Sequence, residues 1–229
     1  MPAKNSVKQF VENSYYHIYN RGVEKRTIFS DEKDYAVFMS YLKNYLLPKD
    51  KSALQQVLSN QNSTSHQKAE ALKLLRMNNF SDLIDLIAHC LMPNHFHLLV
   101  KQSLANGIDL FMNSLTTRYS MYFNKRNKRV GHLFQGTYKA VLVESEEQLI
   151  HLTRYIHCNP ALKGDPLRSY KYSSYGHYLG LNKIGWVKSS KILALFAPSG
   201  PNSYEAFVEY ISDYDSVERI AQLAIDIEG

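Results

Sequence analysis

The sequence predicts an α+β protein in which a largely antiparallel sheet is covered by helices. Segments with strand-like alternation and segments with helical spacing follow one another as strand, helix, strand, strand, helix, strand, helix. Two of the apolar strand segments are separated only by the turn-forming residues Met92-Pro93-Asn94, which favours an antiparallel pair. The length of 229 residues is enough for one sizeable domain with an appendage.

The first strand is expected over residues 14–20, a tyrosine-rich segment that ends at the turn-like Asn20-Arg21-Gly22. Ser30 precedes two acidic residues and predicts a helix start, and apolar residues at helical spacing continue until Pro48 stops the helix. Residues 49–80 are polar and rich in Gln and Asn. We interpret them as an insertion of two short helices joined by an exposed loop.

The middle of the chain predicts the antiparallel pair and the second long helix. Strands are expected over residues 83–91 and 95–101. Apolar residues at helical spacing then run through residues 108–122 and lead into a cluster of Lys and Arg. Residues 139–143 form a further short strand, so this region adds three strands and one helix to the expected sheet.

The last part of the chain opens with a helix start. Ser145 is followed three residues later by Gln148, which fits a capping box, and Pro160 ends the predicted helix. Beyond it the signals weaken into loops and two short helices. We therefore divide the chain into a domain over residues 1–180, which includes the insertion, and a C-terminal helical extension over residues 181–229.

The composition is that of a globular protein, with 45% hydrophobic and 21% charged residues. The formal net charge of +6 permits nucleic acid as a partner. This charge is unevenly spread, because residues 118–171 have a net charge of +6 and residues 203–229 have one of −6. The first segment is a candidate anion-binding surface, and the acidic tail would either repel nucleic acid or dock on that surface.

Several classes of protein do not fit the sequence. The two cysteines, Cys90 and Cys158, form no close pair, which excludes a disulfide framework and favours a reducing compartment. No apolar run approaches the length of a membrane span. The first residues lack the apolar stretch of a secretory signal, so we expect a cytoplasmic protein without a membrane partner.

The motif His95-Phe96-His97 lies in one of the expected strands. Because strand side chains alternate, both imidazoles point to one face of the sheet and Phe96 points to the other. Two imidazoles so placed can bind one metal ion. A pair of polar residues on a half-solvated face is the simpler interpretation of this motif when it is taken alone.

A second motif lies near the end of the last predicted helix. Tyr155 and Asn159 are four residues apart and share one side of that helix, whereas Leu149, Leu152 and Ile156 form its buried stripe. Taken alone, this pair is more simply an ordinary boundary tyrosine and a helix-ending asparagine.

The two motifs together suggest cleavage of a phosphodiester. A free phenol has a pKa of about 10, so a tyrosine nucleophile needs a nearby base or an activated target. A divalent cation such as Mg²⁺ or Mn²⁺, held by two imidazoles and an amide oxygen, can polarise the scissile phosphate. The product would be a phosphotyrosine ester that preserves the energy of the broken bond.

The stretch Leu91–Val100 (LMPNHFHLLV) resembles the signature strand of the single-tyrosine HUH transposases, in particular the REP-associated tyrosine transposases. The resemblance covers about residues 14–180. Other stretches that agree in order are HIYNRG at 17–22, RY at 118–119, YFN at 122–124, FQGTYKA at 134–140, RYIHCNP at 154–160 and YSSY at 172–175. Gln135 departs from the pattern, because relatives often carry an acid there.

The resemblance implies a ferredoxin-like catalytic domain that acts on single-stranded DNA with a divalent metal, Mg²⁺ or Mn²⁺. It implies that His95, His97 and Asn159 are metal ligands. Tyr155 would be the nucleophile that becomes bonded to the 5′ phosphate while a 3′ hydroxyl is freed. Relatives act on palindromic repeats, so a hairpin substrate is expected, and a homodimer is possible.

Tyr119 and Tyr122 are rival nucleophiles by residue type. Their spacing fits the apolar stripe of their own helix, so we interpret them as core or boundary residues.

Cations interleaved with aromatic residues predict a surface for single-stranded DNA, since cations contact the backbone and flat rings contact the bases. The aromatic partners flank the basic cluster of the second long helix. The predicted DNA-binding residues are Arg21, Arg118, Lys125, Arg126, Lys128, Arg129 and Lys139.

Two other functions remain open from the sequence. A structural zinc protein could use Cys90, His95, His97 and Cys158, but their spacing matches no zinc module, and Cys90 is expected to alternate away from the histidines. A DNA-binding regulator of transposase descent that does not cleave would retain the same residues.

Overall fold

The computed structural model describes residues 10–210, and these form a four-stranded sheet with helices on both faces. The strands lie in the order β2-β3-β1-β4, and all neighbours are antiparallel. Two long helices connect them in the sequence order β1, α1, β2, β3, α4, β4, the ferredoxin-like pattern. The bounds are β1 Tyr15–Arg21, α1 Glu32–Leu46, β2 Ile84–Met92, β3 His95–Gln102, α4 Gly107–Arg126 and β4 Lys139–Val143. The predicted α+β class is confirmed.

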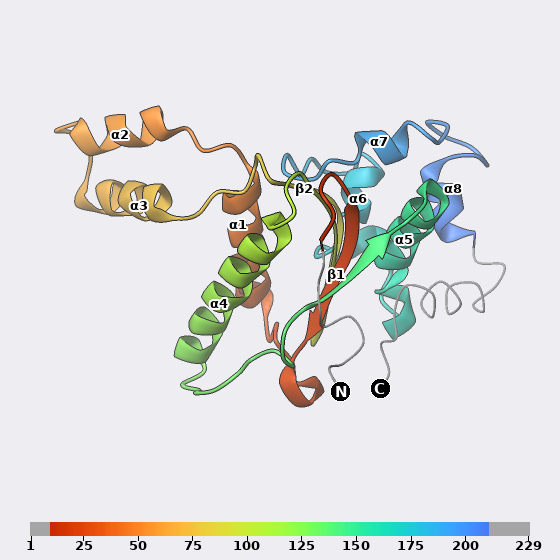
Figure 1. Cartoon of the computed structure of the whole chain (residues 1–229), viewed down its shortest axis with the longest axis horizontal. Helices are drawn as coiled ribbons and strands as arrows, with labels where there is room; N and C mark the ends of the chain where they lie inside the picture. Colours follow the sequence, from red (N-terminus) through yellow and green to blue (C-terminus); the bar gives the residue numbers. More distant parts are fainter. Residues whose placement is uncertain (1–9, 211–229) are drawn as a thin grey trace.

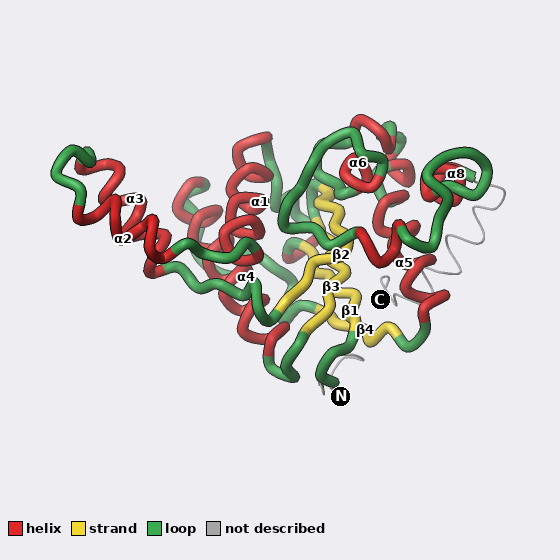
Figure 2. The backbone as a smooth tube through the Cα atoms, turned by 90° about the horizontal axis from the view of Figure 1, so that it is seen from above, coloured by secondary structure: helices red, strands yellow, loops and turns green. Residues whose placement is uncertain are grey.

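The sheet separates two helical layers (Figures 1 and 2). Helices α1 and α4 cover one face, where Phe38 of α1 meets Phe96 of β3 with ring centroids 5.5 Å apart. Helix α5, Glu146–Cys158, covers the other face, where Tyr155 meets His97. Because strand side chains alternate, Phe96 of β3 points towards α1 and α4, and His97 points towards α5. One face of the sheet thus holds the aromatic core, and the other holds the imidazoles.

The hydrogen bonds that cap the starts of α1 and α5 differ slightly from those predicted. The residue that caps α1 is Asp31 and not Ser30, because the Asp31 carboxylate accepts hydrogen bonds from the Lys33 and Asp34 amides. At α5 the Ser145 hydroxyl accepts from the Gln148 amide, as predicted. The Gln148 side chain accepts from the Glu144 amide, one residue before the cap.

The polar segment between α1 and β2 forms an arm of two helices, as predicted for the insertion. Helix α2 spans Lys51–Ser59 and α3 spans Ser65–Arg76, with a complete capping box at Thr64. The two helices pack against each other and project away from the sheet (Figures 1 and 2). Few of their side chains are buried, which agrees with the polar composition of the segment.

The segment after α5 runs along the outer edge of β2 and covers it. The Leu91 amide donates to the Tyr172 carbonyl, and the Lys188 amide donates to the Leu86 carbonyl. Covering an edge strand satisfies backbone groups that would otherwise be exposed to pairing with another chain. This segment contains the short elements η2 Ala161–Lys163, η3 Leu167–Ser169, α6 Tyr175–Tyr178, α7 Ser190–Leu193 and α8 Tyr204–Glu209, whereas η1 Val23–Lys25 follows β1.

The proposed boundary at residue 180 stays a prediction, and most of the acidic tail lies outside the described residues. No helix among residues 10–210 is both long and apolar enough to span a membrane.

An ion-pair network joins α1 to the end of α4. Arg126 donates to Asp31 at 2.7 Å and also pairs with Asp34, whose side chain is completely buried. Asp34 further accepts from the Ser30 amide at 2.9 Å and from the Tyr122 hydroxyl at 3.0 Å. Arg126 therefore has a structural role, and its predicted contact with DNA stays a prediction.

Asp31→Asn is expected to reduce the dependence of stability on acid pH. Its hydrogen bond with Arg126 holds the pKa of the Asp31 carboxyl well below its usual range in the folded protein. A depressed pKa stabilises the fold above the unfolded value, about 4, and this contribution is lost as the pH falls below it. Denaturant unfolding from about pH 6 to pH 3 should therefore show a smaller loss in the variant than in the wild type. Equal losses would contradict the assignment, and Glu24→Gln, at an exposed pair with Arg26, is the control.

Candidate active site

Strand β3 places the two histidines of the motif side by side on the face under α5. The ring centroids of His95 and His97 are 5.0 Å apart in an edge-to-face arrangement. His97 is almost fully buried, with 1% of its surface exposed, whereas His95 lies nearer the end of the strand and is partly exposed. The His95 ring is held by the Asn94 side chain at 2.7 Å.

Helix α5 brings Tyr155 over this pair. The Tyr155 ring lies edge-to-face to His97, with centroids 5.5 Å apart, and it is 4% exposed. The sequence placed Tyr155 and Asn159 apart from the buried stripe of the helix. They are in fact also buried, and the Tyr155 ring lies against His17 and His97 of the sheet.

Asn159 connects the tyrosine to the first histidine. It follows α5 directly, and its amide nitrogen donates to the Tyr155 carbonyl at 3.0 Å. Its side chain also lies near enough to the His95 imidazole and the Tyr155 phenol to affect the pKa of both groups. The phenol, the two imidazoles and the carboxamide thus converge from β3 and α5.

Burial sets the charge of these groups. It lowers the pKa of His95 to about 4, against a smaller opposing effect of Asn159, and it lowers the pKa of His97 well below the usual value. Both imidazoles are therefore neutral near pH 7, which is the form that binds metal ions. Burial also raises the pKa of the Tyr155 phenol above its usual value, so attack by this group requires activation.

A third histidine, which the sequence analysis did not single out as a site residue, supports the pair from the neighbouring strand. His17 of β1 is completely buried, and its Nε2 lies 3.0 Å from Nδ1 of His97. When Nδ1 of His97 donates this hydrogen bond, its Nε2 carries a lone pair. Only the strand register reveals this contact, because it places His17 diagonally from His97 across the β1–β3 ladder.

The donor set fits a divalent cation. Nε2 of His97 is fully buried and has no hydrogen-bond partner among the described residues. A buried imidazole nitrogen without a partner is costly, and a metal ion would satisfy it. No three His, Cys, Asp or Glu side chains within residues 10–210 form a metal-binding group by themselves. The amide oxygen of Asn159 could supply a third ligand beside His95 and His97.

Two cations flank this group. Arg21, at the end of β1, lies directly opposite His95 in the strand register and bonds through Nε to Gln135. Lys163 in η2, which the sequence analysis did not select, is close enough to His95 to contribute to lowering its pKa. Both side chains could contact the phosphate backbone of a nucleic-acid strand that lies at His95 and His97.

The basic cluster at the end of α4 lies in the other helical layer (Figure 2). Arg118 lies over the Tyr41 ring, Arg126 pairs with α1, and Arg129 bonds to Asn124. Lys125 and Lys128 are exposed. Lys139, in contrast, belongs to β4, beside β1.

The rival tyrosines also lie in that layer. Tyr119 is fully buried, and its hydroxyl donates to the Ile28 carbonyl at 2.5 Å. The Tyr122 hydroxyl donates to Asp34. Both are packed as the helical stripe predicted.

The expectation that Cys90 points away from the histidines is wrong. Cys90 is paired with His97 in the β2–β3 register, and paired residues share a face of the sheet. Its thiol contacts the Met92 sulfur at 3.6 Å, whereas the Cys158 thiol lies 3.6 Å from the Val208 carbonyl. Neither contact resembles a zinc ligand.

One protein family matches the central part of the chain. Residues 59–159 match the model of the family described as transposase IS200-like. The matched segment includes β2, β3, α4, β4 and α5, and with them His95, His97, Tyr155 and Asn159. The match covers 101 of the 229 residues, so the central part of the chain is similar to an IS200-like transposase. No curated protein sequence matches it.

Solved structures give weaker likenesses. One is the REP-associated tyrosine transposase bound to a REP hairpin, with 10% identity, a TM-score of 0.45, and coverage of 81% of this chain and 92% of that one. A candidate transposase from Deinococcus radiodurans has 15% identity, a TM-score of 0.27, and coverage of 68% and 95%. The tRNA(His) guanylyltransferase from Saccharomyces cerevisiae has 12% identity, a TM-score of 0.33, and coverage of 96% and 82%.

Proposed function

We propose that the chain cleaves and rejoins single-stranded DNA through a covalent bond to Tyr155, with a divalent metal at His95, His97 and Asn159. The observation that carries the proposal is the convergence of a buried phenol, two neutral imidazoles and a carboxamide.

The reaction exchanges one phosphodiester for another. The Tyr155 oxygen attacks the phosphorus, a phosphotyrosine bond forms, and the bond to the 3′ oxygen breaks. The phenol loses its proton and the departing 3′ oxygen gains one, so the product is a free 3′ hydroxyl. A later 3′ hydroxyl reverses the step and reseals the strand without an external energy source.

Each residue of the site has a part in this chemistry. His95, His97 and Asn159 would hold Mg²⁺ or Mn²⁺, which when bound polarises the phosphate and offsets its charge. Helix α5 holds Tyr155 rigidly against β3 and excludes water from its ring. Arg21 and Lys163 attract the backbone on either side of the scissile phosphate.

The substrate is an unpaired strand, since only such a strand can bend to bring its phosphate against a buried tyrosine. A hairpin or palindromic repeat that presents this strand agrees with the resemblance to REP-associated tyrosine transposases. A homodimer would supply a second tyrosine where two ends are exchanged.

Replacing Arg21 and Lys163 together by Ala is expected to weaken binding to single-stranded DNA. Each phosphate contact contributes about −0.7 to the slope of log K against log salt for single strands, so the slope should become less steep by about 1.4. Fluorescence anisotropy at several salt concentrations measures it.

The matched control removes Lys51 and Arg76, an exposed pair of the same residue types on the arm. If the slope of log K against log salt is unchanged in the Arg21 and Lys163 variant, or changes equally in the control, these two residues do not contact the bound DNA.

A further inference from the structure

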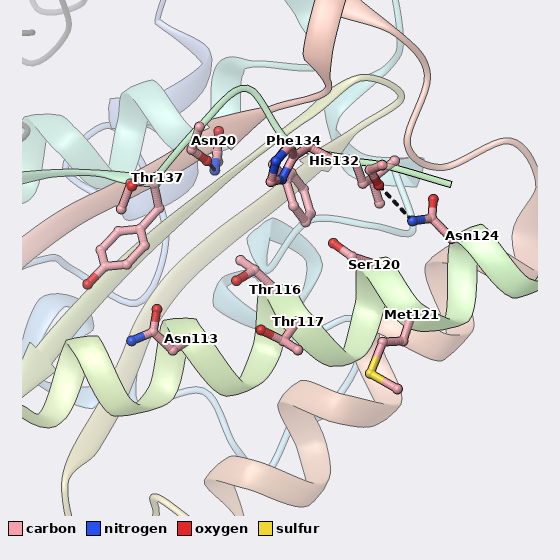
Figure 3. A pocket seen from close by; sticks show the side chains of 14 residues that line it. Asn20, Asn113, Thr116, Thr117, Ser120, Met121, Asn124, His132, Phe134 and Thr137 are labelled. Carbon is pink, nitrogen blue, oxygen red and sulfur yellow. Dashed lines mark hydrogen bonds between the residues drawn. The ribbon is translucent and has the colours of Figure 1, made fainter. Parts of the chain in front are cut away.

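A cavity of about 500 Å³ lies beside α4, and neither His95 nor His97 lines it (Figure 3). One wall is α4, and the other is the loop of residues 131–138 that leads into β4. Asn20, near the end of β1, lies at the same cavity. Nothing in the chemistry proposed for Tyr155 uses this space.

The walls of the cavity carry neutral hydrogen-bonding groups. Asn113, Thr117 and Ser120 of α4 and Thr137 of the loop line it, and none of these side chains hydrogen-bonds to any described residue. No Asp, Glu, Lys or Arg side chain described in the structure lines the cavity. A phosphate or a metal ion would therefore meet only the imidazole of His132, whereas a neutral ligand with several donors and acceptors would be satisfied.

The inner part of the cavity is apolar. Leu133, Phe134 and Tyr138 are buried and line it, and the Phe134 ring points towards the polar side of α4 in Figure 3. A ligand that has a flat apolar face and a hydrogen-bonding edge matches this combination. A nucleobase has both, and it offers that edge only when it is unpaired.

The end of β1 connects the cavity to the candidate active site. Arg21 lies opposite His95, and the preceding residue, Asn20, faces the other side of the sheet, where it lines the cavity. The loop is fixed at this point, because Asn20 donates to the Gly136 carbonyl at 3.3 Å and the Gln135 amide donates to the Arg21 carbonyl at 2.8 Å. A DNA strand bound at Arg21 can thus run past this end of the sheet and reach the cavity.

We propose that this cavity receives one unpaired base of the DNA strand bound at the active site and reads its identity. The proposal rests on the proposed function, because DNA is the ligand. It assigns sequence preference to Asn113 and Thr117, which do not contact the reacting phosphate.

The test is a scan of binding affinity with a set of single-stranded oligonucleotides, each lacking one base at a different position. Tyr155→Phe protein is used so that no strand is cleaved. Loss of the base that enters the cavity should weaken binding about 5- to 100-fold, the range for one well-held base. In protein that also carries Asn113→Ala and Thr117→Val, the penalty at that position should become smaller, because the apolar wall is retained, while the rest of the profile is kept.

Asn106→Ala is the matched control, because Asn106 precedes α4, is exposed and makes no side-chain cap. It should leave the whole profile unchanged. A flat profile, or a penalty of unchanged size in the double variant, would overturn the proposal. A photoreactive 5-iododeoxyuridine at the sensitive position gives a second measurement, since it should cross-link to Phe134 or Tyr138, and cross-linking only elsewhere would also overturn it.

The outcome can be separated from that of the proposed function by assaying the covalent adduct in protein with Tyr155 intact. An adduct together with a flat profile would overturn the base site alone. A base-specific penalty that depends on Asn113 and Thr117, without any adduct, would support the base site and contradict the cleavage chemistry.

Discussion

Tyr155→Phe is expected to abolish the covalent adduct between this protein and single-stranded DNA while leaving DNA binding nearly unchanged. The substitution removes only the oxygen that attacks, and the ring still packs on His97. Removal of a nucleophile from a covalent catalyst lowers the rate by roughly 10⁴-fold or more. The measurement incubates labelled hairpins that carry single-stranded flanks with protein and Mn²⁺, and it detects the adduct on a denaturing gel.

Tyr119→Phe and Tyr122→Phe are the controls, because both hydroxyls bond to protein groups in the other helical layer. Both variants should still form the adduct. If the adduct persists in Tyr155→Phe and is lost in Tyr119→Phe or Tyr122→Phe, the nucleophile is a tyrosine of α4.

His97→Ala is expected to remove tight Mn²⁺ binding even in the absence of DNA. The variant takes away the buried nitrogen that has no partner among the described residues, and His95 with Asn159 cannot replace it. Titration followed by the electron paramagnetic resonance signal of free Mn²⁺ measures this directly. If His97→Ala binds Mn²⁺ as tightly as the wild type does, the proposed metal site is contradicted.

His17→Phe should have a smaller effect in the same titration. Residues that orient a metal-bound histidine typically contribute about 10–100-fold to metal affinity, and His17 holds Nδ1 of His97 at 3.0 Å. His66→Ala, an exposed histidine on the arm, should bind Mn²⁺ as the wild type does.

Much of the fold could be predicted from the sequence, because local signals coincide with its elements. The alternation around His95 and the turn at Pro93 define the β2–β3 pair, and Ser145 with Pro160 bounds α5. The convergence of Tyr155 on the two histidines required the family resemblance. Spacing places residues on a face of one element, and it does not say which elements pack together.

The missed residues have no local signal of their own. The local sequence does not distinguish His17 from the other residues of a tyrosine-rich strand, and only the register between β1 and β3 places it beside His97. Lys163 lies in an irregular turn, whose path depends on tertiary packing. The ion pair of Arg126 with the buried Asp34 likewise has no local signal, because the two residues are far apart in the sequence.

The most direct test of the account is to identify the amino acid that carries DNA after cleavage. The wild-type adduct is digested with protease and nuclease, and the modified peptide is sequenced by mass spectrometry. The account predicts a nucleotide 5′ phosphate on Tyr155 alone. A nucleotide on any other residue, or complete strand cleavage with no protein-bound nucleotide, would contradict it.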